Sequence, residues 1–222
     1  MRLVYPDWET LVDFDDGGIW VINCENPTYY SGIIRELISQ KQTNTGRFIL
    51  SKGDKILDFS KSCEIILSPF SLDFENKKII TTVLKKICEI ARDEEYVETQ
   101  ELLGNILSYV YRLADLCDID VTLNDEVDLN QLIKSTGIQL SRDNEDMSSQ
   151  LIDYMILLKS LLNIELIIGI DFKAYFSKEE LMAIYEIVKQ KKLAIILLES
   201  NRSGDRIESE KWLTIDADLC EI

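Results

Sequence analysis

The sequence predicts an α/β fold in which both ends of the chain form a parallel-sheet head domain and an α-helical leg is inserted between them. Strand-like apolar segments occupy the first 70 residues and return after residue 163. Between them, residues 71–162 contain no proline and only two glycines, and their apolar residues follow helical spacing. We therefore expect residues 1–70 and 163–222 to form one discontinuous α/β domain and residues 71–162 to form the helical one.

The N-terminal segment predicts short strands and one helix. VDFDDGGIWVINC has the pattern of two strands around a turn, where Gly17 and Gly18 can adopt positive φ. Asn26 then suits an N-cap and Pro27 the first position of a helix that runs through YYSGIIRELISQ. RFILSKGDKILDF predicts a hairpin centred on residues 52–54, and CEIILSP predicts a short buried strand that ends at proline.

The middle segment predicts four helices. Apolar residues recur at helical spacing between Lys77 and Arg92, and a second stripe runs from Leu102 to Leu113. A short helix, DLNQLIKS, ends at Gly137, which suits a C-terminal cap. The fourth helix covers SSQLIDYMILLKSLLN, so this segment is expected to be a helical bundle.

The C-terminal segment returns to alternating strands and helices. The apolar strand IELIIGID ends at Asp171, and the next helix opens at Ser177 with Glu180 three residues later, which is a capping box. The strand LAIILLES, the polar loop NRSGDRIESE and the strand KWLTID follow. Continuous apolar strands that alternate with helices are typical of a parallel sheet covered on both faces.

Composition excludes several kinds of site. The chain has no histidine, which excludes Ser-His and Cys-His nucleophile pairs and histidine metal ligands, so a bound metal would be a hard cation held by oxygen. The five cysteines are scattered without a CxxC pair, as expected of reduced thiols. No apolar run is long enough to cross a bilayer and the N-terminus does not resemble a signal peptide, so we expect a cytoplasmic protein. The formal net charge of −16 favours solubility, cation binding or a basic partner, although local lysine clusters remain possible.

The strand that ends at Asp171 raises the question of nucleotide hydrolysis, because ATPases place a magnesium-binding acid in this position. A phosphate loop requires GxxxxGK[ST], and this chain has no such motif. The first strand–helix junction carries Pro27 where a free amide is needed, and the glycine-rich Rossmann fingerprint is also missing. We therefore expect Asp171 to cap a turn and the protein to bind no nucleotide.

An acidic loop at residues 117–129 leaves two interpretations open. Its five carboxylates repel one another unless they are solvated or neutralised by a cation such as calcium. The EF-hand pattern fails, because Leu123 occupies the glycine position and Leu129 the position of the bidentate glutamate. The residues alone favour a solvated connection in which Asp128 caps the next helix. The candidate ligands are Asp118, Asp120, Asp125, Glu126 and Asp128.

A basic stripe follows the first long helix. Lys78, Lys85 and Arg92 are spaced by seven residues and therefore lie near one face, with Lys77 and Lys86 beside them. Such a ridge is suited to phosphate contacts with duplex DNA. The residues alone favour the simpler interpretation, the solvated face of an amphipathic helix, so the stripe does not decide the function.

The order of the elements, with several local motifs, resembles over nearly the whole chain the short form of the accessory adaptation protein of type II-A CRISPR systems. The motifs are NDEVDLNQLIKSTGIQL, the segment LLKSLLNIELIIGIDFKAYFSKEEL, the strand LAIILLESNR and the C-terminal WLTIDADLCEI. None is a catalytic signature. The resemblance implies a P-loop-ATPase-like head without nucleotide chemistry and a helical leg. It also implies a homotetrameric ring that calcium stabilises and that threads double-stranded DNA ends through a positively lined channel.

The resemblance assigns roles to individual residues. Asp125 and Glu126 match the acidic pair before LIK and become the first candidates for calcium, while Asp118, Asp120 and Asp128 fit the pattern less well. The candidate DNA contacts are Lys77, Lys78, Lys85, Lys86, Arg92 and Lys134.

The expected function is therefore non-catalytic, sequence-independent binding of duplex DNA in spacer acquisition, in the cytoplasm of a bacterium. The expected partners are duplex DNA, three further copies of the chain, and the integrase complex and RNA-guided nuclease of the same system. Two alternatives stay open: an acidic scaffold for a basic protein partner that binds no DNA, and a carboxylate-dependent nuclease.

Overall fold

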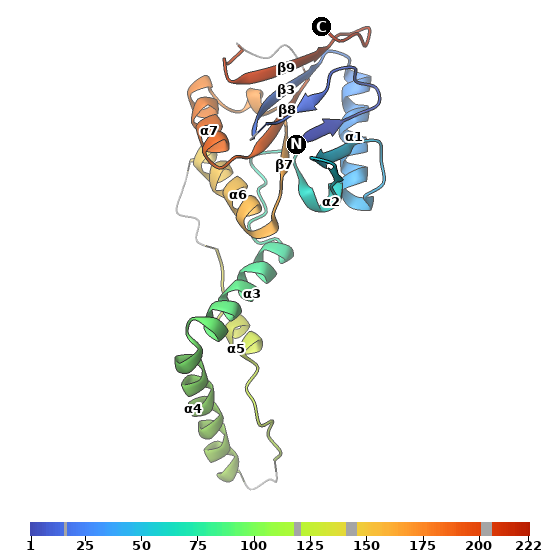
Figure 1. Cartoon of the computed structure of the whole chain (residues 1–222). Coiled ribbons are helices and arrows are strands. Elements are labelled where there is room, and N and C mark those ends of the chain that lie inside the picture. Colours follow the sequence, from blue (N-terminus) through green and yellow to red (C-terminus); the bar gives the residue numbers. More distant parts are fainter. Residues whose placement is uncertain (16, 118–120, 141–145, 201–205) are drawn as a thin grey trace. The chain divides into compact units, whose positions relative to one another are not determined.

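A computed structural model gives the fold and describes residues 1–15, 17–117, 121–140, 146–200 and 206–222 (Figure 1). The chain divides into two compact units, residues 1–73 with 142–222, and residues 74–141. The first is the α/β unit and the second is helical, in agreement with the predicted fold class. Helix α6 (Met147–Leu162) lies in the α/β unit, although its sequence pattern had grouped it with the helices of the leg.

A five-stranded parallel sheet forms the centre of the α/β unit. Its strand order is β6-β7-β8-β3-β9, and all four neighbouring pairs are parallel. The strands are β3 (Gly18–Cys24), β6 (Cys63–Ile66), β7 (Leu166–Ile170), β8 (Ala194–Glu199) and β9 (Glu210–Ile215). Every residue of β7 and β8 is buried, as the continuous apolar runs predict for strands covered on both faces.

One face of this sheet is covered by α1 (Pro27–Thr43), α2 (Phe59–Ser62) and a small antiparallel sheet. The order of the small sheet is β2-β1-β4-β5, with β1 at Arg2–Val4, β2 at Val12–Asp13, β4 at Ile49–Lys52 and β5 at Lys55–Ile56. The predicted hairpin of β4 and β5 is confirmed. The two strands around Gly17 and Gly18 exist, but they do not pair with each other: β2 pairs with β1, and β3 pairs with β8 and β9.

The opposite face is covered by α6, by the short 3-10 helix η1 (Phe172–Ala174) and by α7 (Lys178–Gln190). Figure 1 shows α6 and α7 on one side of the sheet and α1 and α2 on the other. The capping box predicted for α7 is present, because the Ser177 hydroxyl and the Glu180 carboxylate each accept the backbone N–H of the other residue (3.3 and 2.7 Å).

A buried ion pair joins these elements to β9. The Lys173 ammonium lies 2.8 Å from Oε1 of Glu210, and the two side chains are only 3% and 0% exposed. The same carboxylate accepts hydrogen bonds from the Tyr185 hydroxyl (2.6 Å), the Trp212 indole N–H (2.9 Å) and the Ile207 backbone N–H (3.0 Å). Glu210 therefore ties η1, α7 and β9 together, and its charge is well compensated.

The helical unit consists of α3 (Lys77–Asp93), α4 (Tyr96–Asp115) and α5 (Leu129–Ser135). Helix α4 is twenty residues long and has no buried residue. Gly137 follows α5 with a φ of 68°, as the sequence predicted for its C-terminal end. Within the described part of the chain, no helix is both long enough and apolar enough to cross a membrane.

Candidate metal and nucleic-acid sites

The connection between β3 and α1 stands where an ATPase would carry its phosphate loop. Only two residues, Glu25 and Asn26, separate the strand from Pro27 at the start of the helix. The Asn26 side-chain oxygen accepts the backbone N–H groups of Thr28 (3.1 Å) and Tyr29 (3.0 Å). The amides that could hold a phosphate at this helix end are thus occupied by the helix's own cap.

The carboxylate of Asp171 is also occupied by a hydrogen bond within the protein. It adopts a left-handed backbone with a φ of 52°, and its carboxylate accepts the backbone N–H of Ser200 at 2.9 Å. The Tyr30 hydroxyl donates to the carbonyl oxygen of Leu198 (3.2 Å), and burial together with the Asp171 carboxylate raises the pKa of Tyr30. Asp171 therefore joins the end of β7 to the residue that follows β8. Its side chain makes no cap hydrogen bond to η1, so the expected capping of the turn by this carboxylate is wrong.

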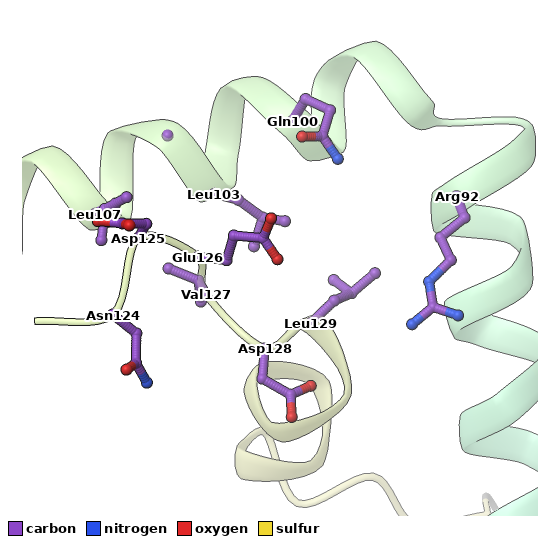
Figure 2. A pocket seen from close by; sticks show the side chains of 11 residues that line it. Arg92, Gln100, Leu103, Leu107, Asn124, Asp125, Glu126, Val127, Asp128 and Leu129 are labelled. Atoms are coloured by element: carbon purple, nitrogen blue, oxygen red, sulfur yellow. The ribbon is translucent and has the colours of Figure 1, made fainter.

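The acidic loop lines a hollow of about 940 Å³ in the helical unit. Asp125, Glu126 and Asp128 lie on one wall, and Arg92 of α3 lies on another. In Figure 2, Glu126 and Arg92 point into this hollow from opposite sides. Asp118 and Asp120, the remaining candidate ligands, lie outside the described residues.

The three described carboxylates do not converge. Asp128 caps α5 by accepting the backbone N–H groups of Asn130 (2.8 Å) and Gln131 (3.2 Å), as predicted. The Tyr111 hydroxyl lies 3.4 Å from Asp125, and the carboxylates of Asp125 and Asp128 point in different directions (Figure 2). Among the described residues, no group of three or more acidic or cysteine side chains is placed to hold a metal ion. The donor chemistry suits calcium, but the described part of one chain offers an incomplete set of ligands.

The six basic candidates are all exposed. Five belong to α3 and the sixth, Lys134, lies in the last turn of α5. The Lys85 ammonium lies 3.8 Å from the Glu89 carboxylate, an exposed pair of little energetic weight. Lys77 and Lys78 occupy the first turn of α3, which contains no acidic residue. Because the helix dipole places partial positive charge at that end, two lysines there are electrostatically unfavourable for the helix itself.

Sequence patterns found these lysines but missed another group. Lys52, Lys159, Lys191 and Lys192 line one hollow of the α/β unit. They lie on three separate segments, and no spacing in the sequence predicts that they come together in the fold. The one local signal for this group is the pair of adjacent lysines in QKK at residues 190–192. That pair does not indicate which other lysines lie near it in the fold.

A comparison with known families gives a match, whereas a comparison with curated proteins gives none. The model of the CRISPR-associated protein (Cas_Csn2) family matches residues 40–219, which is 180 of the 222 residues. This match confirms the resemblance found in the sequence and implies a role in CRISPR adaptation. The chain belongs to the Cas_Csn2 family of CRISPR-associated proteins.

Proposed function

We propose that this protein binds the ends of double-stranded DNA without catalysis and without sequence preference, as a calcium-stabilised homotetrameric ring that supports spacer acquisition. The observation that carries the proposal is the basic face of α3 in a chain of net charge −16. Lys77 and Lys78 oppose the dipole of their own helix, so helix stability does not account for them. A phosphate group near that helix end would compensate the charge of both lysines. The helix end itself is capped, because the Asn76 side chain accepts the backbone N–H of Lys78 at 2.9 Å.

The proposal of a larger assembly rests on α4. Its twenty residues include no buried one, yet it carries large apolar side chains along its length. The most exposed are Tyr96 (56%), Val97 (66%), Leu102 (54%) and Tyr109 (53%). A helix of this kind is stable in water only if a partner covers its apolar residues. Further copies of the same chain are the partner that the family resemblance favours.

Calcium is proposed at a contact between subunits. Asp125 and Glu126 supply carboxylate oxygens, which suit calcium, while the described residues of one chain supply too few ligands. A second copy would complete the set. Chelation should therefore shift the tetramer toward smaller species in sedimentation, and Asp125→Asn with Glu126→Gln should do the same in the presence of calcium. An unchanged tetramer in both experiments would leave the loop as a solvated connection.

The absence of catalysis is proposed from the β3–α1 connection. Its two residues are too few for a phosphate loop, and Asn26 already occupies the first amides of α1. ATP or GTP turnover by the pure protein that disappears in the Asp171→Asn variant would show that this proposal is wrong.

Duplex binding is tested by its dependence on salt. Lys78→Ala with Lys85→Ala should lower the slope of log K against log salt by about one to two units per engaged subunit, because each lost phosphate contact removes ~0.9. A variant with Lys61→Ala and Lys178→Ala removes the same charge from exposed positions of the α/β unit and should leave the slope unchanged. A wild-type slope in the first variant would mean that these lysines face solvent.

Ring threading is tested separately with linear and closed-circular duplex. Linear duplex should bind in calcium and should stay bound when bulky blocks are fixed at both ends after loading. Equal affinity for closed circles would refute threading. The alternative function, an acidic scaffold for a basic protein, is favoured by the net charge alone. It predicts no mobility shift with either form of DNA, with calcium or with chelator.

A further inference from the structure

A second basic surface lies in the α/β unit, at the amino-terminal ends of the parallel strands. It is a hollow of about 310 Å³ whose walls include the residues just before β7 and β3 and the first residue of β8. Four lysines, Lys52, Lys159, Lys191 and Lys192, face two carboxylates there. The described side chains that line the hollow thus carry a net charge of +2 in a protein of net charge −16, so they bring positive charge together at this point.

Two of these ammonium groups already converge on an oxyanion. The Glu165 carboxylate lies 3.1 Å from the Lys52 ammonium and 2.8 Å from the Lys159 ammonium, one oxygen toward each. Lys52 extends from β4 of the small sheet and Lys159 from the last turn of α6. The hollow therefore holds a carboxylate between two lysines from different elements, which is the geometry that an oxygen of a phosphate group could adopt.

The other two lysines lie in the turn between α7 and β8. Lys191 is the C-cap residue that follows α7, and Lys192 adopts a left-handed backbone with a φ of 51°. A cation near a helix C-terminus is favourable for the helix, and this effect accounts for part of the arrangement. It does not account for Lys52, which belongs to a strand, nor for a lysine in a backbone conformation that favours glycine.

We propose that this hollow binds a small, multiply charged phosphate anion of the size of pyrophosphate. Its volume lies near the lower end of the ~300–1,000 Å³ range of small-molecule pockets. Lysines bind phosphate groups as point charges, so the excess positive charge suits a polyanion better than a single carboxylate. A DNA duplex is too wide to enter such a hollow. Its described lining residues all belong to the α/β unit, and none of them is among the proposed duplex contacts on α3.

The test titrates inorganic pyrophosphate into the full-length protein by calorimetry, at low ionic strength and without added divalent cations. Lys159→Gln and Lys191→Gln should each weaken binding about tenfold (about 1.4 kcal/mol). Lys61→Gln, a lysine outside the hollow, serves as the control with the same change in charge and should bind like the wild type. Glu165→Gln should bind more tightly, because it removes the carboxylate that competes for Lys52 and Lys159. Misfolding of a variant would lower the affinity, so a gain in affinity in Glu165→Gln could not be caused by misfolding.

The outcomes are distinct. No binding heat with the wild type, or equal affinities in the hollow variants and the control, would overturn the proposal. A short linear duplex is then added to the protein saturated with pyrophosphate. Retained pyrophosphate binding, also in the Lys78→Ala and Lys85→Ala variant, supports a separate small-anion site even if duplex binding itself fails. Displacement of pyrophosphate by the duplex, together with lost duplex affinity in Lys191→Gln, would assign the hollow to DNA and refute the proposal.

Discussion

Replacing Lys173 by methionine should destabilise the α/β unit strongly. The change removes the one cation that lies against the fully buried Glu210 carboxylate, at 2.8 Å, within the described part of the structure. It also removes an ammonium group 4.5 Å from the centre of the Trp212 ring. Methionine has a similar length and fills the space, so the loss is electrostatic rather than a cavity.

The expected cost is about 3 kcal/mol. Breaking a buried ion pair on one side typically costs about 3–5 kcal/mol, because the remaining charge stays buried without its partner. Three neutral donors, from Tyr185, Trp212 and Ile207, still reach the Glu210 carboxylate, which places the cost at the lower end. Adding Glu210→Gln should restore most of the loss, since no uncompensated charge is left.

The assay is denaturation by urea, followed by tryptophan fluorescence at a fixed protein concentration. All three tryptophans, Trp8, Trp20 and Trp212, belong to the α/β unit, so the signal reports on that unit alone. Lys52→Met is the matched control, because the Lys52 side chain is 58% exposed and its ion pair with Glu165 should contribute less than about 1 kcal/mol. Equal, small losses in the two variants would refute the assignment of Glu210 as a buried charge that depends on Lys173.

Two other changes test packing and titration. Gly169→Ala should destabilise the α/β unit by about 1–3 kcal/mol, because an added Cβ would lie 2.6 Å from the ring of Phe172, whereas Gly104→Ala in α4, with nothing within 4 Å, should stabilise its helix by up to about 1 kcal/mol. Equal effects in thermal unfolding would contradict the packing described at Gly169. The hydrogen bond from Arg47 outweighs partial burial and holds the pKa of Glu36 below its usual value. A lowered folded-state pKa adds stability above the unfolded value of about 4.3, and this stability is lost as the pH falls through the folded value. Glu36→Gln should therefore lower the unfolding midpoint at pH 7 and reduce its change between pH 5 and pH 3, and an unaltered pH profile would exclude this linkage.

Local signals in the sequence were sufficient to predict where several helices begin or end. The Ser177–Glu180 capping box, the Asn26 cap and the end of α5 near Gly137 are all confirmed, because each depends on residues within one turn of a helix. Strand pairing is different. Gly17 and Gly18 predicted a hairpin at the start of β3, whereas the partners of β3 in β8 and β9 lie 176 and 191 residues further along the chain. A turn signal carries no information about partners at that distance.

In the candidate sites too, the features that depend on local spacing were predicted, and those that depend on packing were not. The spacing of Lys78, Lys85 and Arg92 by seven was enough to place them near one face of α3, because a helix has a fixed period. The sequence predicted that the Asp128 carboxylate caps α5, because a helix cap is a local pattern. It could not predict that the Asp125 carboxylate accepts a hydrogen bond from the Tyr111 hydroxyl. The lysines around Glu165 meet only after β4, α6 and α7 have packed, so no local pattern revealed them.

The position of β3 in the sheet has a consequence for synthesis on the ribosome. Both strands that flank it, β8 and β9, are translated after the entire helical unit. At about 5–20 residues per second, the apolar residues of β3 wait roughly 9–38 s for their hydrogen-bonding partners, while the helices of residues 74–141 have already emerged. Until α7 is translated, α1 and the small antiparallel sheet are the elements available to shield β3. The nascent chain therefore passes through a state with an open, apolar strand edge, and substitutions that weaken α1 packing should reduce the yield of folded protein more than they reduce its final stability.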